Sequence, residues 1–243
     1  WVIGIGMLVF GINFNLIYLF LLGKFKQVWE SEELKWYIFI VIGTVGLICL
    51  NLFSTYDSFS VLIRDVFFTV SSIITTTGFS TADFGKWPLF SQTILLLLMF
   101  VGACAGSTAG GLKVSRVVVY AKIFVAEVKR MANPSRIVTV LYDKKPLNKN
   151  TKHSVANYLI IYFLLFAGML VLLTLDVPDF LSAFSAVAAT FNNIGPALGV
   201  VGPAHSFAEL TDFSKIILSF GMLAGRLEIF PILILFSPRT WKK

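Results

Sequence analysis

Long apolar stretches separated by short polar ones are the dominant pattern along the chain. Four of these stretches hold about 20 residues, the length of helix that crosses a hydrocarbon core of roughly 30 Å. Because such stretches recur along the whole chain, a cleaved signal peptide does not account for them. The pattern therefore predicts an all-α membrane protein. The four predicted spans are Trp1 to Leu22, Trp36 to Phe53, Val155 to Leu175 and Phe213 to Phe236.

Two shorter apolar segments do not fit this crossing pattern. Val61 to Thr75 and Asp179 to Asn192 each hold about 14 residues, or roughly 20 Å of helix, which is too short to cross. Lysine and arginine gather in the connections at 24–35 and 112–153 and in the C-terminal tail, which the positive-inside rule places in the cytoplasm. Both short segments then begin and end on the outer side. We expect each to be a re-entrant pore helix.

An internal repeat supports this interpretation. Aligning Gly78 with Gly195 also places Phe67 on Phe184, so each short segment leads into a polar run that contains a glycine. The chain is predicted to hold repeated units of helix, re-entrant pore helix, filter loop and helix around a pore, at residues 24–153 and 154–243. Residues 1–23 are expected to be the closing helix of a preceding repeat. Since two pore loops cannot close a ring alone, we expect the chain to be the C-terminal part of a longer polypeptide.

The polar runs have the layout that a potassium filter requires. Backbone carbonyls that face one axis can replace the water around the ion, and glycine permits the positive φ that turns a carbonyl inward. The preceding helix directs the negative end of its dipole at the ion. For either run alone an ordinary helix C-cap is the favoured alternative, but recurrence after matched short helices favours the filter. The residues predicted to bind K⁺ through their carbonyls are Thr76, Thr77, Gly78, Phe79, Asn193, Ile194, Gly195 and Pro196.

A dense run of small residues lies between the apolar run Ile94 to Val101 and the helix-like segment Leu112 to Phe124. Three glycines among six residues predict a break near the middle of the membrane, and a broken helix beneath a filter can act as a gate. A close helix crossing is the alternative, although the run is too rich in glycine for a crossing alone. The predicted gating loop consists of Gly106, Ser107, Thr108, Ala109, Gly110 and Gly111.

Arg226 lies inside the last apolar span, where a charge costs about 2.5 to 3.5 kcal/mol, so it should face water or a partner. It is expected either to point into the pore cavity and set its field, or to bind a carboxylate or carbonyls of a neighbouring helix. The sequence leaves both possibilities open. Glu228, two positions along, does not share its helix face.

Composition and charge exclude other classes of protein. Hydrophobic residues make up 57% of the chain, and the net charge of +7 comes from loops that flank apolar spans, which indicates orientation in a membrane and not nucleic-acid binding. Cys49 and Cys104 lie in apolar spans, and His153 and His205, placed in loops, have no metal-ligand spacing, so no organic cofactor and no catalytic residue is predicted. A secondary transporter for another solute would be expected to show inverted repeats, and an intramembrane enzyme would need a base near Ser107. These two classes are the alternatives.

Four motifs together resemble a known family, the bacterial Trk/Ktr-type potassium uptake proteins, nearer the Trk branch. The resemblance implies a four-repeat, single-chain pore in the bacterial inner membrane, with repeats three and four in this chain. It implies that Gly78 and Gly195 are filter glycines, that the gating loop lies below them, and that Arg226 enters the path of K⁺. As partners it implies membrane lipid, a second copy of the chain and a cytoplasmic nucleotide-binding regulatory ring. The motifs are Thr75 to Thr81, Gly102 to Lys113, Asn192 to Gly199 and Gly225 to Phe230.

Overall fold

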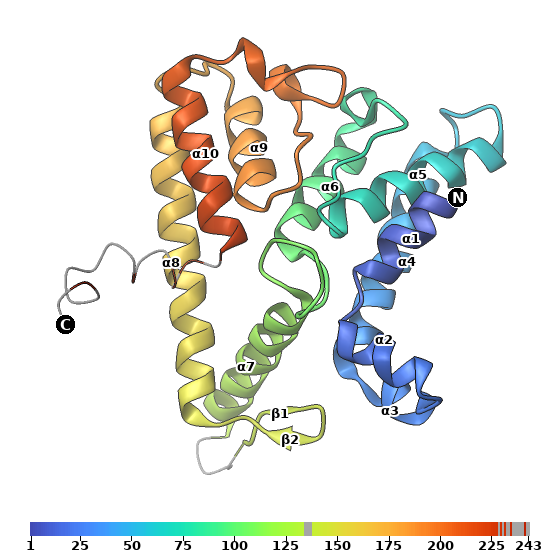
Figure 1. Cartoon of the computed structure of the whole chain (residues 1–243), viewed down its shortest axis with the longest axis vertical. Helices are drawn as coiled ribbons and strands as arrows, with labels where there is room; N and C mark the ends of the chain where they lie inside the picture. The colour runs from blue at the N-terminus through green and yellow to red at the C-terminus, as the bar shows by residue number, and fades with distance from the viewer. Residues whose placement is uncertain (134–137, 228, 230, 232–233, 235–240, 242–243) are drawn as a thin grey trace.

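The computed structural model describes residues 1–133 and 138–227 and four positions beyond them, 229, 231, 234 and 241 (Figure 1). The predicted positions Glu228 and Phe230 and most of the end of the last predicted span lie outside the described residues. Apart from one small hairpin, the regular structure of the described residues is helical, so the predicted all-α fold is confirmed. The helices are α1 (Val2–Phe10), α2 (Phe14–Leu21), α3 (Phe25–Glu30), α4 (Glu32–Leu52), α5 (Phe59–Ile74), α6 (Leu89–Val101), α7 (Val114–Ala132), α8 (Lys149–Leu173), α9 (Phe180–Phe191) and α10 (Asp212–Arg226), and the hairpin joins β1 (Leu141–Tyr142) to β2 (Lys145–Pro146).

Two of the described helices, α4 with 21 residues and α8 with 25, are long and apolar enough to cross a membrane. Helices α1 and α2 would form a third span if the bent pair is counted as a single span. Ser31 caps α4 by accepting the Leu34 N–H at 3.4 Å, and two glutamates in the first turn face the positive end of the helix dipole. Helix α8 begins before the predicted Val155, so His153 lies in its first turns and not in a loop.

The prediction that Trp1 to Leu22 forms one helix is wrong, because the chain bends by 104° between α1 and α2, whereas the crossing of the membrane by this pair stays a prediction. Asn13 caps α2 by accepting the Asn15 N–H at 2.8 Å. On either side of the bend the backbone bonds to a distant segment: the Gly11 carbonyl accepts the Cys104 N–H, and the Phe14 N–H donates to the Gly106 carbonyl, each at 3.1 Å. The bend therefore exchanges helical hydrogen bonds for bonds to the segment from Cys104 to Gly106, where the predicted gating loop begins.

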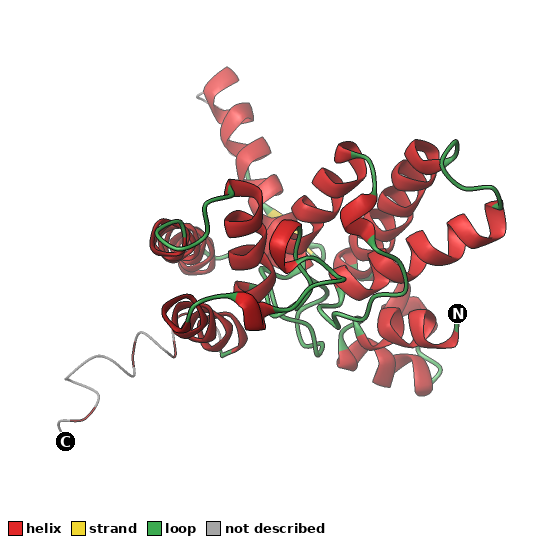
Figure 2. Cartoon of the chain, turned by 90° about the horizontal axis from the view of Figure 1, so that it is seen from above, coloured by secondary structure: helices red, strands yellow, loops and turns green. Residues whose placement is uncertain are grey.

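The two repeats show the same order of elements, α4–α5–α6 and α8–α9–α10 (Figure 1). The short helices α5 and α9 have 16 and 12 residues, which is roughly 24 Å and 18 Å at 1.5 Å per residue. In each repeat the short helix packs between its neighbours: α5 contacts α4 and α6, and α9 contacts α8 and α10. Helix α6 also contacts α9 and α7 contacts α8, so the second helix of the first repeat joins the two repeats (Figure 1). Seen from above, helices surround a central group of loops (Figure 2).

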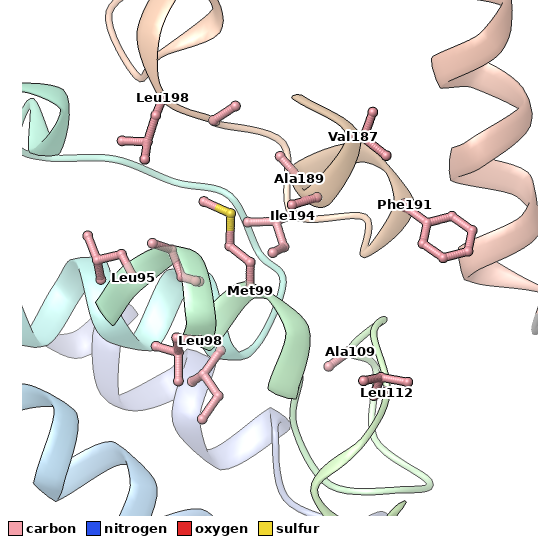
Figure 3. Close-up of a cluster of buried hydrophobic side chains, with 14 of the residues drawn as sticks. Leu95, Leu98, Met99, Ala109, Leu112, Val187, Ala189, Phe191, Ile194 and Leu198 are labelled. Atoms are coloured by element: carbon pink, nitrogen blue, oxygen red, sulfur yellow. The ribbon is translucent and has the colours of Figure 1, made fainter. Parts of the chain in front are cut away.

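A cluster of buried hydrophobic side chains lies where α6 meets the loop that follows α9 (Figure 3). Leu95 and Met99 of α6 are fully buried, and the Met99 side chain points toward Ile194 of that loop. Ala109 and Leu112 of the predicted gating region are also buried and lie near the end of α6. This packing fixes α6, the second filter loop and the gating region relative to one another.

Candidate functional site

The two predicted filter loops have the same backbone pattern. After α5, Thr76 has φ 54° and Gly78 has φ 82°; after α9, Asn193 has φ 58° and Gly195 has φ 110°. The positive φ values fall at corresponding positions of the two repeats. A β-branched residue such as Thr76 rarely adopts a positive φ. An ordinary C-cap needs only one residue of this kind. The repeated pair therefore indicates that both loops present their backbone in the same way.

The two filter loops also lie against each other. A Cβ atom on Gly78 would collide with the carbonyl oxygen of Ile194 and would lie 3.3 Å from Pro196 Cδ. A Cβ atom on Gly195 would come no nearer than 4.0 Å to its closest neighbour, the Gly78 Cα. The structure thus brings the two predicted filter glycines side by side. Thr77, Phe79 and Gly195 are exposed, whereas Ile194 is buried.

Hydrogen bonds fix the first filter loop to the end of its own pore helix. The Thr75 hydroxyl donates to the Ser71 carbonyl at 2.6 Å and lies 2.8 Å from the Thr77 hydroxyl oxygen. The Thr77 N–H donates to the Ser72 carbonyl at 2.9 Å. The direction of this loop is therefore set by α5.

The second filter loop is fixed by α8 and α10 as well as by α9. Asn192 is fully buried; its Nδ2 donates to the Ala188 carbonyl at 2.9 Å, and its Oδ1 accepts from the Tyr162 hydroxyl of α8 at 2.8 Å. Asn193 Nδ2 donates to the Met222 carbonyl of α10 at 3.0 Å. Sequence reasoning missed Tyr162, because a tyrosine inside an apolar span gives no sign of its partner.

The break below the filter loops is longer than predicted. Helix α6 ends at Gly102, where φ is 69°, and α7 begins at Val114, so the non-helical segment extends beyond the expected Gly106 to Gly111 on both sides. The Gly110 N–H donates to the Thr76 hydroxyl at 2.8 Å, and a Cβ atom on Gly110 would collide with the Asn192 carbonyl oxygen. The predicted gating loop therefore contacts the base of both filter loops.

Two basic side chains bind consecutive carbonyls of the gating loop. Arg226 Nη1 donates to the Thr108 carbonyl at 2.6 Å, and Lys113 Nζ donates to the Ala109 carbonyl. A Cβ atom on Gly225 would collide with the Phe191 carbonyl oxygen, so α10 runs close to the end of α9 and brings Arg226 beneath the second filter loop. Arg226 thus contacts a carbonyl of the gating loop and its side chain is exposed, and the expectation that it points into the pore cavity stays a prediction.

Two carboxylates lie near the N-termini of α9 and α10, at the opposite end of these helices from Arg226. Asp179 caps α9, and its hydrogen bonds from the Ser182 hydroxyl and N–H lower its pKa. Hydroxyl bonds from Ser214 and Thr211 lower the pKa of Asp176 in the same way. Both side chains are therefore ionised at neutral pH, and negative charge lies at this end of the second repeat.

Glu33 is a further residue that sequence reasoning missed. It is the second residue of α4, is 5% exposed, and binds backbone groups on both sides of the gating loop. The signal that could have found it is its position, since an acidic residue directly before an apolar span must find partners when the helix packs.

Comparisons with known proteins identify the family of this chain. Residues 1–243 match the TrkH family, described as cation transport protein. The Trk system potassium uptake protein TrkH of Salmonella typhimurium is 38% identical over 246 residues, which cover 100% of this chain and 50% of the relative. The Trk system potassium uptake protein TrkG of Escherichia coli K12 is 33% identical over 233 residues, covering 95% and 47%.

A solved structure resembles this chain over nearly its whole length. The crystal structure of the potassium transporter TrkH from Vibrio parahaemolyticus matches with a TM-score of 0.89 at 36% identity, covering 98% of this chain and 52% of that one. The chain spans about half the length of the curated relatives that it matches. The resemblance predicted from the motifs is confirmed: the chain belongs to the TrkH family of cation transport proteins.

Proposed function

We propose that this chain takes up potassium ions through a filter to which its two loops contribute backbone carbonyls. The chain is a multi-pass protein of the bacterial inner membrane. One observation carries the proposal: two loops from different repeats have positive φ at corresponding positions and meet at Gly78 and Gly195. Carbonyls presented in this way suit a partly dehydrated cation. The names of the relatives, potassium uptake proteins, support K⁺ as the transported ion.

We further propose that residues 24–153 and 154–243 are the third and fourth repeats of a longer pore and that residues 1–23 close the second. The potassium ion is cargo in this mechanism and passes the filter carbonyls without a resident cofactor. A second copy of the chain, membrane lipid and a cytoplasmic nucleotide-binding regulatory ring are the proposed partners. The name "Trk system" carried by the relatives supports an assembly of several components.

Flux through reconstituted protein tests the proposed function. We expect vesicles that hold the purified full-length protein to take up potassium faster than sodium under equal gradients. Vesicles without protein are the control for leakage. Folded protein that passes neither ion, while it carries an organic solute, would contradict the proposal and favour the solute transporter.

We propose that the loop Gly106 to Gly111 closes the path beneath the filter. Its contacts with Thr76 and Asn192 support this position, and its glycines give it the low local stability of an element that can move. Removing Ser107 to Ala109 should raise potassium flux without changing the preference for potassium over sodium. The measurement is flux per folded molecule, with the folded fraction taken from size-exclusion chromatography. Unaltered flux in folded protein would mean that the loop is only a break in packing.

A further inference from the structure

One buried carboxylate bridges the two ends of the gating loop. Glu33 Oε1 accepts the Ala105 N–H at 2.6 Å and the Ser115 N–H at 3.2 Å. Ala105 comes directly before the loop, and Ser115 is the second residue of α7, the helix that follows the loop. A single oxygen atom from α4 therefore joins the points where the chain enters and leaves the loop.

The chemistry of this bridge favours the closed arrangement. The first N–H groups of a helix have no intrahelical partner, and a carboxylate there also meets the positive end of the dipole. The Ala103 carbonyl accepts the Val114 N–H at 3.0 Å, so a second hydrogen bond joins the segments before and after the gating loop.

An ordinary helix cap does not explain the whole arrangement. A cap for α7 would need only the Ser115 N–H, whereas Glu33 also holds Ala105 across the loop. Glu33, Ala105 and Ser115 line a cavity of about 500 Å³ together with Asn13. A loop end that is released from the carboxylate thus has open space into which it can move.

We propose that Glu33 is a positioning residue that holds the gating loop closed by joining its two ends. The inference rests on the proposed function, in which this loop closes the potassium path. Losing the carboxylate should free the loop ends while the filter loops keep their backbone, since Glu33 contacts neither filter loop through the bonds described above. Flux should rise and ion preference should stay the same.

The test compares Glu33→Ala and Glu33→Gln with Glu32→Gln in the full-length protein. Glu32 is the matched control, because it is adjacent and acidic but binds Lys122 of α7 and not the loop ends. Hydrogen exchange followed by mass spectrometry measures the peptide 102–116 directly. We expect exchange there to rise about tenfold in Glu33→Ala, a ratio that corresponds to about 1.4 kcal/mol, and to stay unchanged in Glu32→Gln. Potassium flux should also rise in Glu33→Ala.

The two readouts separate the bridge from the gate. Unchanged exchange at 102–116 in Glu33→Ala would overturn the role of Glu33. Faster exchange with unchanged flux would support the bridge and overturn the proposed gate, whereas faster exchange with lower flux would show that the bridge holds the path open. Should Glu33→Ala not fold, Glu33→Gln decides, because its amide oxygen keeps one acceptor while the charge is lost, and it should show a smaller change in the same direction.

Discussion

Replacing Gly195 by valine is expected to abolish the preference for potassium over sodium in protein that still folds. At φ 110° a β-branched residue is strained by about 1 to 3 kcal/mol. The nearest atom to a Cβ at this position, the Gly78 Cα, lies 4.0 Å away, so the strain does not come from a collision. The peptide must rotate to relieve this strain, which moves the carbonyls that are proposed to face the ion. The measurement is the ratio of potassium to sodium flux in reconstituted vesicles.

Two further glycine variants make this result specific. Gly78→Ala should lower folded yield as well as selectivity, because its Cβ would collide with the Ile194 carbonyl of the other loop. Gly168→Val is the matched control: this glycine is an exposed residue of α8, and no atom of another segment lies within 4 Å of the position that a Cβ would take there. It should leave both quantities unchanged. A normal flux ratio in Gly195→Val would remove Gly195 from the filter.

Segment length explains why the pore helices could be predicted. The expected segments Val61 to Thr75 and Asp179 to Asn192 differ from α5 and α9 by no more than two residues at either end. Each apolar run ends at polar residues, which mark the end of the helix. A helix that is too short to cross the membrane can adopt few arrangements within it. The local sequence was sufficient here, because neighbouring residues determine the length and the ends of each short helix.

The bend between α1 and α2 could not be predicted in the same way. Its hydrogen bonds run from Gly11 and Phe14 to Cys104 and Gly106, about ninety residues away, and the apolar pattern continues through the bend. The gating loop was visible as a run of glycines, but the contacts of this region with Glu33 and Asn192 come from distant segments. Contacts between distant segments decided both features, and hydropathy alone does not report such contacts.

The direction of Arg226 was also undecided by sequence, because it depends on how closely α10 approaches α9. Gly225 lies against the Phe191 carbonyl and permits that approach, and the guanidinium then reaches Thr108. The Arg226 side chain is exposed where it makes this contact. Water can therefore replace the lost hydrogen bond when the arginine is changed, so the large penalty for breaking a buried ion pair does not apply.

Arg226→Gln is accordingly expected to raise potassium flux by roughly tenfold to a hundredfold while folded yield and ion preference stay near normal. This exposed hydrogen bond contributes about 1.5 kcal/mol, the low end for a bond to a charged group, and each 1.4 kcal/mol is a factor of about ten in the fraction of open loops. Removing the charge also removes repulsion, which at about 6 Å and an effective dielectric near 20 amounts to roughly 2.8 kcal/mol for a potassium ion.

The matched control for this change is Arg130→Gln at the end of α7, where the arginine pairs with Glu127 at 3.0 Å and lies outside the loop. Flux and folded yield are measured on the same preparation of each variant. If Arg226→Gln lowers the yield but leaves flux per folded molecule unchanged, the residue stabilises the bundle and forms no barrier. A rise in flux for Arg226→Gln and not for Arg130→Gln ties the barrier to the position of Arg226 beside the gating loop, because both variants lose one positive charge and only Arg226 contacts that loop.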